Sequence, residues 1–92
     1  SNLMDSLEKL GRSLDDSLRG DLEKFVYKLL EMTRMGRRSD VMYIITRMYV
    51  TNNKEIPSEL LEVFKPIYDD ETFKTLIYTF IGSAIKTEGE GG

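Results

Sequence analysis

Apolar residues recur at helical spacing along most of this chain, with charged and polar residues between them. In the first segment the leucines are separated by steps of four, three, four and four residues, which places one apolar stripe on one side of a helix. The stripe consists of Leu3, Leu7, Leu10, Leu14 and Leu18. An interior Gly11 costs a helix about 1 kcal/mol relative to Ala, and the sequence Asp-Asp-Ser at 15–17 is unfavourable inside a helix. We therefore expect this segment to bend or end near residues 15–17.

The leucine stripe has two interpretations. It can be a zipper seam for a partner helix, or the inward face of an ordinary amphipathic helix that packs on its own core. A coiled coil requires heptads sustained over three or four repeats, and this stripe is too short for that. The second interpretation is therefore favoured, but an exposed part of the stripe, represented by Leu3, Leu7 and Leu14, remains a candidate docking surface.

Two further helices are expected in the middle of the chain. The second begins near Asp21, after Gly20, and ends at Gly36, a residue suited to the left-handed conformation that closes helices. The third begins at Ser39 or Asp40. Their expected inward residues are Leu22, Phe25, Val26, Leu29 and Leu30 in the second, and Val41, Ile44, Ile45 and Met48 in the third. The third segment is rich in β-branched residues and Tyr, so a strand competes. Apolar steps of three and four, together with the lack of a partner strand, favour helix.

The second half of the chain predicts a turn, a short helix and a long final helix. Asn52 and Asn53 indicate the turn, and Pro57 suits the first turn of a helix over residues 58–65. Asp69 and Asp70 are expected to cap the last helix. The expected inward residues are Leu60, Leu61 and Phe64 in the short helix, and Phe73, Leu76, Ile77, Phe80, Ile81, Ala84 and Ile85 in the last one. Because this last pattern is uninterrupted, we expect the C-terminal helix to be central.

Together these elements predict an all-α fold, a small bundle of four to five short helices. A chain of 92 residues holds one core, so we expect a single helical domain over residues 3–86 and a flexible C-terminal tail over 87–92. The last helix also carries small residues at which another helix could approach closely, namely Thr72, Thr75, Thr79, Gly82 and Ser83. Such a face serves either a partner protein or, more commonly, a neighbouring helix of the same chain.

Composition narrows the class of protein. With 40% hydrophobic and 32% charged residues the chain is globular in composition. Its longest uncharged run, over residues 75–85, is too short to span a membrane, and residues 1–18 lack the apolar core of a signal peptide. The chain has no Cys, which excludes disulfides and thiolate metal sites and favours a cytoplasmic setting.

Candidate chemistry is sparse, because His and Cys are both absent and most acid-base and nucleophilic sites use them or a pair of carboxylates. The carboxylates lie mainly at expected helix starts, where capping and the helix dipole explain them. No calcium loop or phosphate loop is present in the sequence. We therefore expect a protein that is not an enzyme and has no cofactor, metal or small-molecule substrate.

Charge is segregated along the chain. Residues 28–47 carry five basic residues against two acidic ones, a net charge of +3, whereas residues 54–74 carry three against six, a net charge of −3. Four of the central bases are arginines, which form bidentate contacts with carboxylate or phosphate. They are Arg34, Arg37, Arg38 and Arg47. Tyr43 and Tyr49 are close enough in sequence to offer stacking faces to single-stranded nucleic acid.

Three interpretations of this arginine corner compete. It is a solvated loop, a surface for an acidic protein segment that includes the acidic segment of another copy, or a contact to RNA or DNA backbone. A pI near 4.9 argues against a free-standing nucleic-acid binder, but allows a subunit that adds a few phosphate contacts. In general shape, a short helical bundle with an arginine corner resembles the small helical subunits of CRISPR effector complexes. That resemblance rests on no sequence motif and assigns no residue a role.

The sequence therefore predicts a non-enzymatic protein-interaction or scaffold module that docks through an apolar strip and the arginine corner. The alternative is a small helical subunit of a ribonucleoprotein complex. An open apolar patch left by the first helix would favour docking, and convergence of the four arginines on one face would favour nucleic acid. An enzyme would require a pocket that encloses two or more carboxylates.

Overall fold

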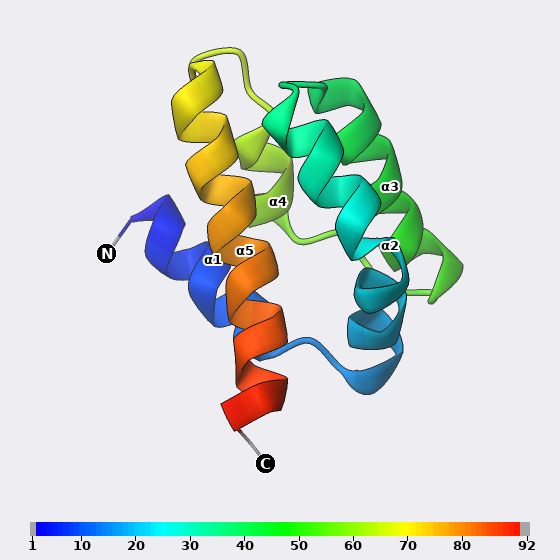
Figure 1. Cartoon of the computed structure of the whole chain (residues 1–92). Coiled ribbons are helices and arrows are strands. Elements are labelled where there is room, and N and C mark those ends of the chain that lie inside the picture. The colour runs from blue at the N-terminus through cyan, green and yellow to red at the C-terminus, as the bar shows by residue number, and fades with distance from the viewer. Residues whose placement is uncertain (1, 91–92) are drawn as a thin grey trace.

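Five helices make up the fold of the computed structural model, which describes residues 2–90 and the side chains of residues 2–85. They are α1 (Leu3–Arg12), α2 (Asp16–Arg34), α3 (Arg38–Thr51), α4 (Ser58–Val63) and α5 (Asp70–Glu90). No strand occurs between residues 2 and 90. The expected all-α bundle is confirmed (Figure 1).

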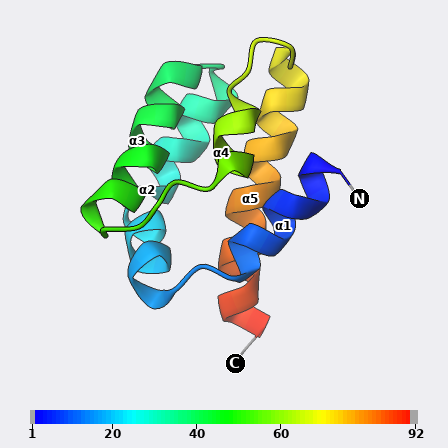
Figure 2. The same cartoon turned by 180° about the vertical axis from the view of Figure 1, so that it is seen from behind.

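The C-terminal helix α5 is the centre of the bundle. It packs against α1, α2 and α4, whereas α3 packs on α2. Seen from behind, α1 crosses α5 while α2 and α3 form an antiparallel pair at the side (Figure 2). Six of the seven expected inward residues of α5 are buried, namely Phe73, Leu76, Ile77, Phe80, Ile81 and Ala84. Ile85 is the exception, because it lies beyond the part of α5 that the other helices cover and is 37% exposed.

The α1–α2 boundary lies where the sequence predicted a bend, but α2 begins earlier than expected. The backbone N–H of Leu18 donates to the Asp15 carboxylate at 2.9 Å, which satisfies an otherwise free amide of the first turn. This cap starts α2 at Asp16, so the predicted start at Asp21 is wrong and Gly20 lies within the helix. Nothing lies within 4 Å of a Cβ atom placed at Gly20, so packing does not require glycine at this position.

The α2–α3 turn is closed by Gly36, as predicted. Its φ of 70° is left-handed, and the N–H groups of Gly36 and Arg37 donate to the carbonyls of Thr33 and Met32 at 3.0 and 2.9 Å. This is the Schellman pattern of helix termination. Helix α3 begins at Arg38, one residue before the earliest predicted start, and no side chain caps it.

Three exposures differ from expectation. Phe25 is 43% exposed because α3 covers α2 only in part, and Leu61 is 48% exposed because the six-residue α4 turns Leu60 and Val63 into the core instead. Tyr49, expected on the surface as a stacking face, is only 3% exposed. Its ring faces inward together with Ile45 and Met48, so it offers no face to a base.

The small-residue face of α5 receives a helix of the same chain, at least around Ser83. Gly11 of α1 is buried directly against this part of α5. The bundle thus uses close helix approach within its own core, which is the more common of the two expected uses.

At the C-terminal end, α5 continues to Glu90 and so extends through residues 87–90 of the range expected as a tail. Gly91 and Gly92 lie outside the described residues. Within the described chain, no helix is both long enough and apolar enough to cross a membrane. Among the same residues, no three acidic side chains are grouped closely enough to hold a metal ion.

Candidate functional site: a groove between α2 and α3

The leucine stripe is not available as a docking surface. Leu7 is fully buried and Leu14 is 6% exposed, while Leu3 is partly buried against the same core. Leu14 lies in the connection between α1 and α2, where the chain turns and carries the stripe inward. The expectation that Leu7 and Leu14 form part of a docking strip is therefore corrected, because a partner could reach them only by opening the fold.

Two of the four candidate arginines pair with acidic residues in their own turn of the chain. Arg34 forms a bidentate contact with the Glu31 carboxylate, three residues earlier in α2. The Arg37 guanidinium lies 2.7 Å from the Asp40 carboxylate. The Arg34 guanidinium holds the pKa of Glu31 below its ordinary value. All four side chains are exposed to water, where such pairs contribute little to stability.

Arg38 is a structural residue. Its guanidinium donates to the Tyr68 carbonyl at 2.6 Å and to the Asp70 carboxylate at 3.0 Å. The same group lies 5.0 Å from the ring centroid of Phe73, within the range of a cation–π contact. Arg38 therefore fastens the start of α3 to the start of α5.

Arg47 stands apart from the other three. It follows Arg38 by nine residues, and at about 100° per residue the two point to opposite sides of α3. The Arg47 guanidinium lies 5.8 Å from the ring centroid of Tyr43. The four arginines do not converge on one face, which was the condition set for a nucleic-acid contact.

A groove with a volume of about 500 Å³ lies between α2 and α3. Ligand sites of 300–1,000 Å³ commonly lie between the helices of bundles. The apolar side chains that line this groove are Phe25, Met32, Tyr43, Ile44 and Met48. Its polar side chains are Asp21, Lys24, Lys28, Asp40, Arg47 and Thr51.

The groove is open to solvent because the residues that line it all belong to α2 and α3, and the contacts of α2 with α5 lie elsewhere on α2. Phe25 lies about 60° around α2 from the buried Leu22, so it faces the groove and not the core. Tyr43 is 60% exposed on the opposite wall. The groove therefore has an apolar surface that is accessible to solvent.

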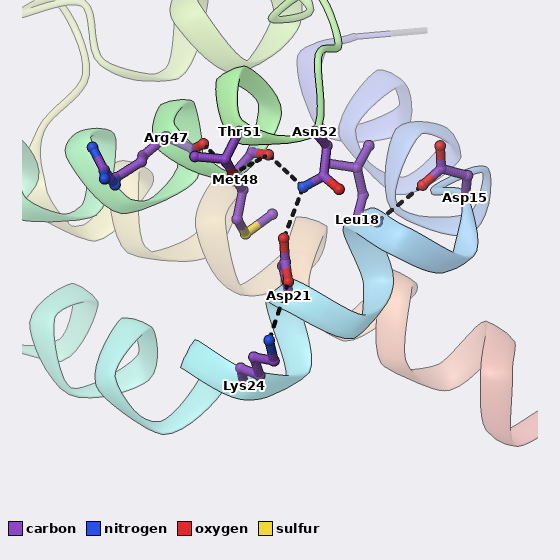
Figure 3. Close-up of polar contacts among 8 residues, drawn as sticks. All are labelled: Asp15, Leu18, Asp21, Lys24, Arg47, Met48, Thr51 and Asn52. Carbon is purple, nitrogen blue, oxygen red and sulfur yellow. Dashed lines mark hydrogen bonds and ion pairs between the residues drawn. The ribbon is translucent and has the colours of Figure 1, made fainter.

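A polar network joins α2 and α3 at one end of the groove (Figure 3). The side-chain amide of Asn52 donates to the Asp21 carboxylate and to the Met48 carbonyl, each at 2.7 Å. The Lys24 ammonium lies 3.7 Å from Asp21, and the Thr51 hydroxyl donates to the Arg47 carbonyl at 2.9 Å. The hydrogen bond between Asn52 and Asp21 joins the C-terminal end of α3 to α2 beside the groove.

Asp21 and Asp40 both line the groove but do not form a catalytic pair. Asp21 is bonded to Asn52, which lies twelve residues and so roughly 18 Å of helix beyond Asp40. The two carboxyl groups of aspartic proteases and of glycoside hydrolases stand roughly 3–10 Å apart. Asp40 is also engaged by Arg37. The groove therefore has two separated carboxylates, each with a partner of its own.

The cations of the groove differ from those elsewhere. Lys28 on α2 and Arg47 on α3 face it from opposite walls, and neither has a carboxylate within 4.0 Å among the described residues. Of the other cations whose side chains the structure describes, Lys9 alone shares this property. The groove thus combines an apolar floor with two cations that no residue of the described chain neutralises.

Sequence reasoning found Arg47 and Tyr43 but missed the groove, together with Phe25 and Lys28. The available signal was the position of Phe25 at the edge of the apolar stripe of α2, which is compatible with either core or surface. A scan against models of protein families, a search of curated proteins and a search of solved structures each found no match. The resemblance in general shape to the small subunits of CRISPR effector complexes receives no support from them.

Proposed function

We propose that this chain is a non-enzymatic protein-interaction module which receives an apolar side chain of an acidic partner segment in the α2–α3 groove. The observation that carries the proposal is the pair Lys28 and Arg47, two cations on opposite walls of an apolar groove that have no carboxylate partner among the described side chains. The lack of Cys accords with a cytoplasmic setting for such a module.

The driving force would be burial of the apolar anchor. Removing one Leu-sized or Phe-sized side chain from water is worth about 1.5–3 kcal/mol, and Phe25 and Tyr43 are exposed enough to lose water as well. Lys28 and Arg47 would contribute orientation and encounter rate more than affinity. The sequence-based hypothesis placed docking on the leucine stripe and on four arginines. The present proposal does not use the stripe, and Arg47 is the only one of the four arginines that it assigns to partner binding.

The nucleic-acid alternative has less support. Three of its four arginines are engaged by Glu31, Asp40 and Asp70, and one of its two tyrosines is buried. Phosphate binding requires cations that gather along a path to release counterions. We keep a short RNA as a competing ligand in the test.

The test is a titration of isotopically labelled protein with a designed helical peptide that carries leucines on one face and glutamates beside them, followed by NMR. We expect amide shifts at residues that line the groove. Lys28→Glu should weaken binding, whereas Lys9→Glu should not, because it makes the same charge change at a lysine outside the groove that also lacks an ion pair with any described carboxylate. Phe25→Ser should weaken binding more than Tyr27→Ser, since Tyr27 is also exposed on α2 but does not line the groove.

Shifts located elsewhere, or equal effects of the matched variants, would overturn the proposal. The same titration with a mixed-sequence RNA at low and moderate salt separates the alternative. Binding of RNA but not peptide, with a salt dependence that Lys28→Glu reduces, would replace the interaction module by the ribonucleoprotein subunit.

A further inference from the structure

The loop between α4 and α5 presents an apolar side chain in an acidic setting. Ile67 is 77% exposed, more than any other aliphatic side chain of Leu or Ile size in the described chain. It follows Pro66, which restricts the backbone of the loop. Three acidic residues follow within four positions, namely Asp69, Asp70 and Glu71.

The negative charge of this loop is only partly neutralised within the chain. Asp70 is paired with Arg38 at 3.0 Å, but the Glu71 carboxylate lies 3.7 Å from Lys74 and is 87% exposed. Asp69 accepts from the N–H of Thr72 at 2.8 Å and has no ion pair with any described cation. Asp69 and Glu71 thus leave negative charge next to Ile67.

Ile67 does not fill the groove of its own chain. It is not among the residues that line the groove. Arg38 also holds the loop at the start of α3 through the Tyr68 carbonyl and Asp70. The loop is therefore fixed in a position where its apolar side chain faces solvent.

We infer that the α2–α3 groove of one copy receives Ile67 of a second copy, with Asp69 and Glu71 facing Lys28 and Arg47. The inference rests on the proposed function, since it names the acidic segment that the groove takes. It follows from complementarity in two respects: the groove is apolar with two unneutralised cations, and the loop is apolar with two incompletely neutralised carboxylates.

The two surfaces are different, so one contact joins the groove of one copy head-to-tail to the loop of the other. The pair then keeps one free groove, on one copy, and one free loop, on the other, for further copies. The contact is also small. Interfaces below about 1,200 Å² belong to weak and transient association. We expect self-association that becomes visible only at high protein concentration and that salt weakens.

The experiment is sedimentation of the full chain from about 10 µM to about 1 mM, a range that covers the Kd of weak contacts. We expect a rise in mean mass with concentration. Phe25→Asp places a charge in the apolar lining of the groove, and Ile67→Asp replaces the apolar side chain of the loop by a charged one. Each variant alone should stay monomeric. Both positions are exposed, so both variants should remain folded, which circular dichroism checks.

Mixing the two variants is the decisive arm. The Phe25→Asp chain retains its loop and the Ile67→Asp chain retains its groove, so together they should form one interface and stop at a 1:1 dimer. Tyr27→Asp and Met4→Asp place the same charge at exposed apolar positions outside both surfaces, and these variants should associate like the unmodified chain.

A chain that stays monomeric over the whole range would overturn the second copy as the occupant, while peptide binding in the groove would leave the proposed function standing. Association that neither Phe25→Asp nor Ile67→Asp reduces would overturn the head-to-tail contact. The same holds if the mixture of variants fails to form a dimer.

Discussion

Gly11 of α1 lies so close to Ser83 of α5 that a Cβ atom at position 11 would come within 2.1 Å of the Ser83 hydroxyl oxygen. The same atom would meet the carbonyl oxygen of Phe80 at 2.6 Å and the amide nitrogen of Ala84 at 3.0 Å. The last two belong to the backbone of α5 and cannot turn aside as a side chain can. Glycine at position 11, unfavourable for α1 as an isolated helix, is what lets α1 reach the centre of the bundle.

Gly11→Ala should therefore destabilise the protein although alanine is the better helix former. Forcing one methyl group into a packed interface typically costs about 1–3 kcal/mol, which exceeds the gain in helix propensity of up to about 1 kcal/mol. The free energy of unfolding from urea titration measures the difference. Gly20→Ala is the matched control, because nothing lies within 4 Å of a Cβ at that helical position. It should stabilise the chain, and loss of stability in both variants would contradict this account.

Arg38→Met should lower the free energy of unfolding by about 1–2 kcal/mol, since it removes hydrogen bonds of a charged group to the Tyr68 carbonyl and to Asp70. The Arg38 side chain is 25% exposed, whereas Arg34 is 64% exposed in its pair with Glu31. Arg34→Met should cost no more than about 0.5 kcal/mol. Urea unfolding of both variants checks the contrast, and equal losses would mean that Arg38 does not fasten α3 to α5.

Asp15 and Asp69, the carboxylates that cap α2 and α5, should make the free energy of unfolding depend on pH in the acidic range. The N–H of Leu18 first, and then Lys54, lower the pKa of Asp15, and hydrogen bonds from Thr72 lower the pKa of Asp69. A carboxyl whose pKa is lower in the folded chain contributes stability above its unfolded pKa of 3.8. That contribution is lost as the pH falls through the folded value.

Asn caps helices about as well as Asp but does not titrate. The double variant Asp15→Asn, Asp69→Asn should consequently lose less stability than the unmodified chain between about pH 6 and about pH 2.5. Urea midpoints at the two pH values measure this. An equal acid-induced loss in both proteins would show that the two caps do not carry the dependence.

Tyr49→Phe should stabilise the protein by about 1 kcal/mol, because the Tyr49 hydroxyl is buried without a hydrogen-bond partner among the described residues. Tyr68→Phe is the control, since its hydroxyl donates to Glu62 at 3.1 Å and its removal should give no gain. Urea unfolding at neutral pH distinguishes the two. A destabilised Tyr49→Phe variant would indicate that the hydroxyl does have a partner.

Burial also raises the pKa of Tyr49 to about 12, above its ordinary value of 10.0. Because the folded chain disfavours the ionised form, ionisation of Tyr49 does not affect the free energy of unfolding below about pH 10. Above that pH the free energy of unfolding falls, and the loss continues as the pH rises through about 12. Tyr49→Phe should flatten that alkaline loss. Burial raises the pKa of Tyr68 as well. In a spectroscopic titration of the folded chain, Tyr49 and Tyr68 should therefore both ionise late, and Tyr49→Phe should remove the step near pH 12.

The sequence predicted the helix ends correctly where a single residue could begin or end the helix. Gly36 ended α2 with a left-handed backbone, and Asp69 capped α5, because each acts on atoms within a few positions of itself. The start of α2 was predicted wrongly because Asp15 and Asp21 are equally able to cap a helix. Turning the chain before Asp15 carries Leu14 into the core, and a choice that depends on the whole bundle cannot be made from a local pattern.

The candidate site was predicted only in fragments. The four arginines have three different environments: Arg38 has partners 30 and 32 residues away, Arg34 and Arg37 pair with neighbours in sequence, and Arg47 alone lines the groove. Sequence spacing predicts the ion pairs of Arg34 and Arg37 with their neighbours. It contains no information on the distant partners of Arg38 or on the position of Arg47 in the groove. The groove itself results from the lack of a helix over α2 and α3, which no stretch of residues encodes.

The sequence by itself determined the class of fold, the number of helices and the central place of the last one, because helical periodicity, caps and turn residues act over three or four positions. Periodicity also predicted most of the buried residues of α5. Only the tertiary structure decided the exposure of the apolar side chains that periodicity left open or assigned wrongly. Leu7 and Leu14 entered the core while Phe25, Leu61 and Ile67 stayed in water, since exposure depends on which helix lies over each face. That coverage is a property of the packed bundle, and so is the groove it leaves.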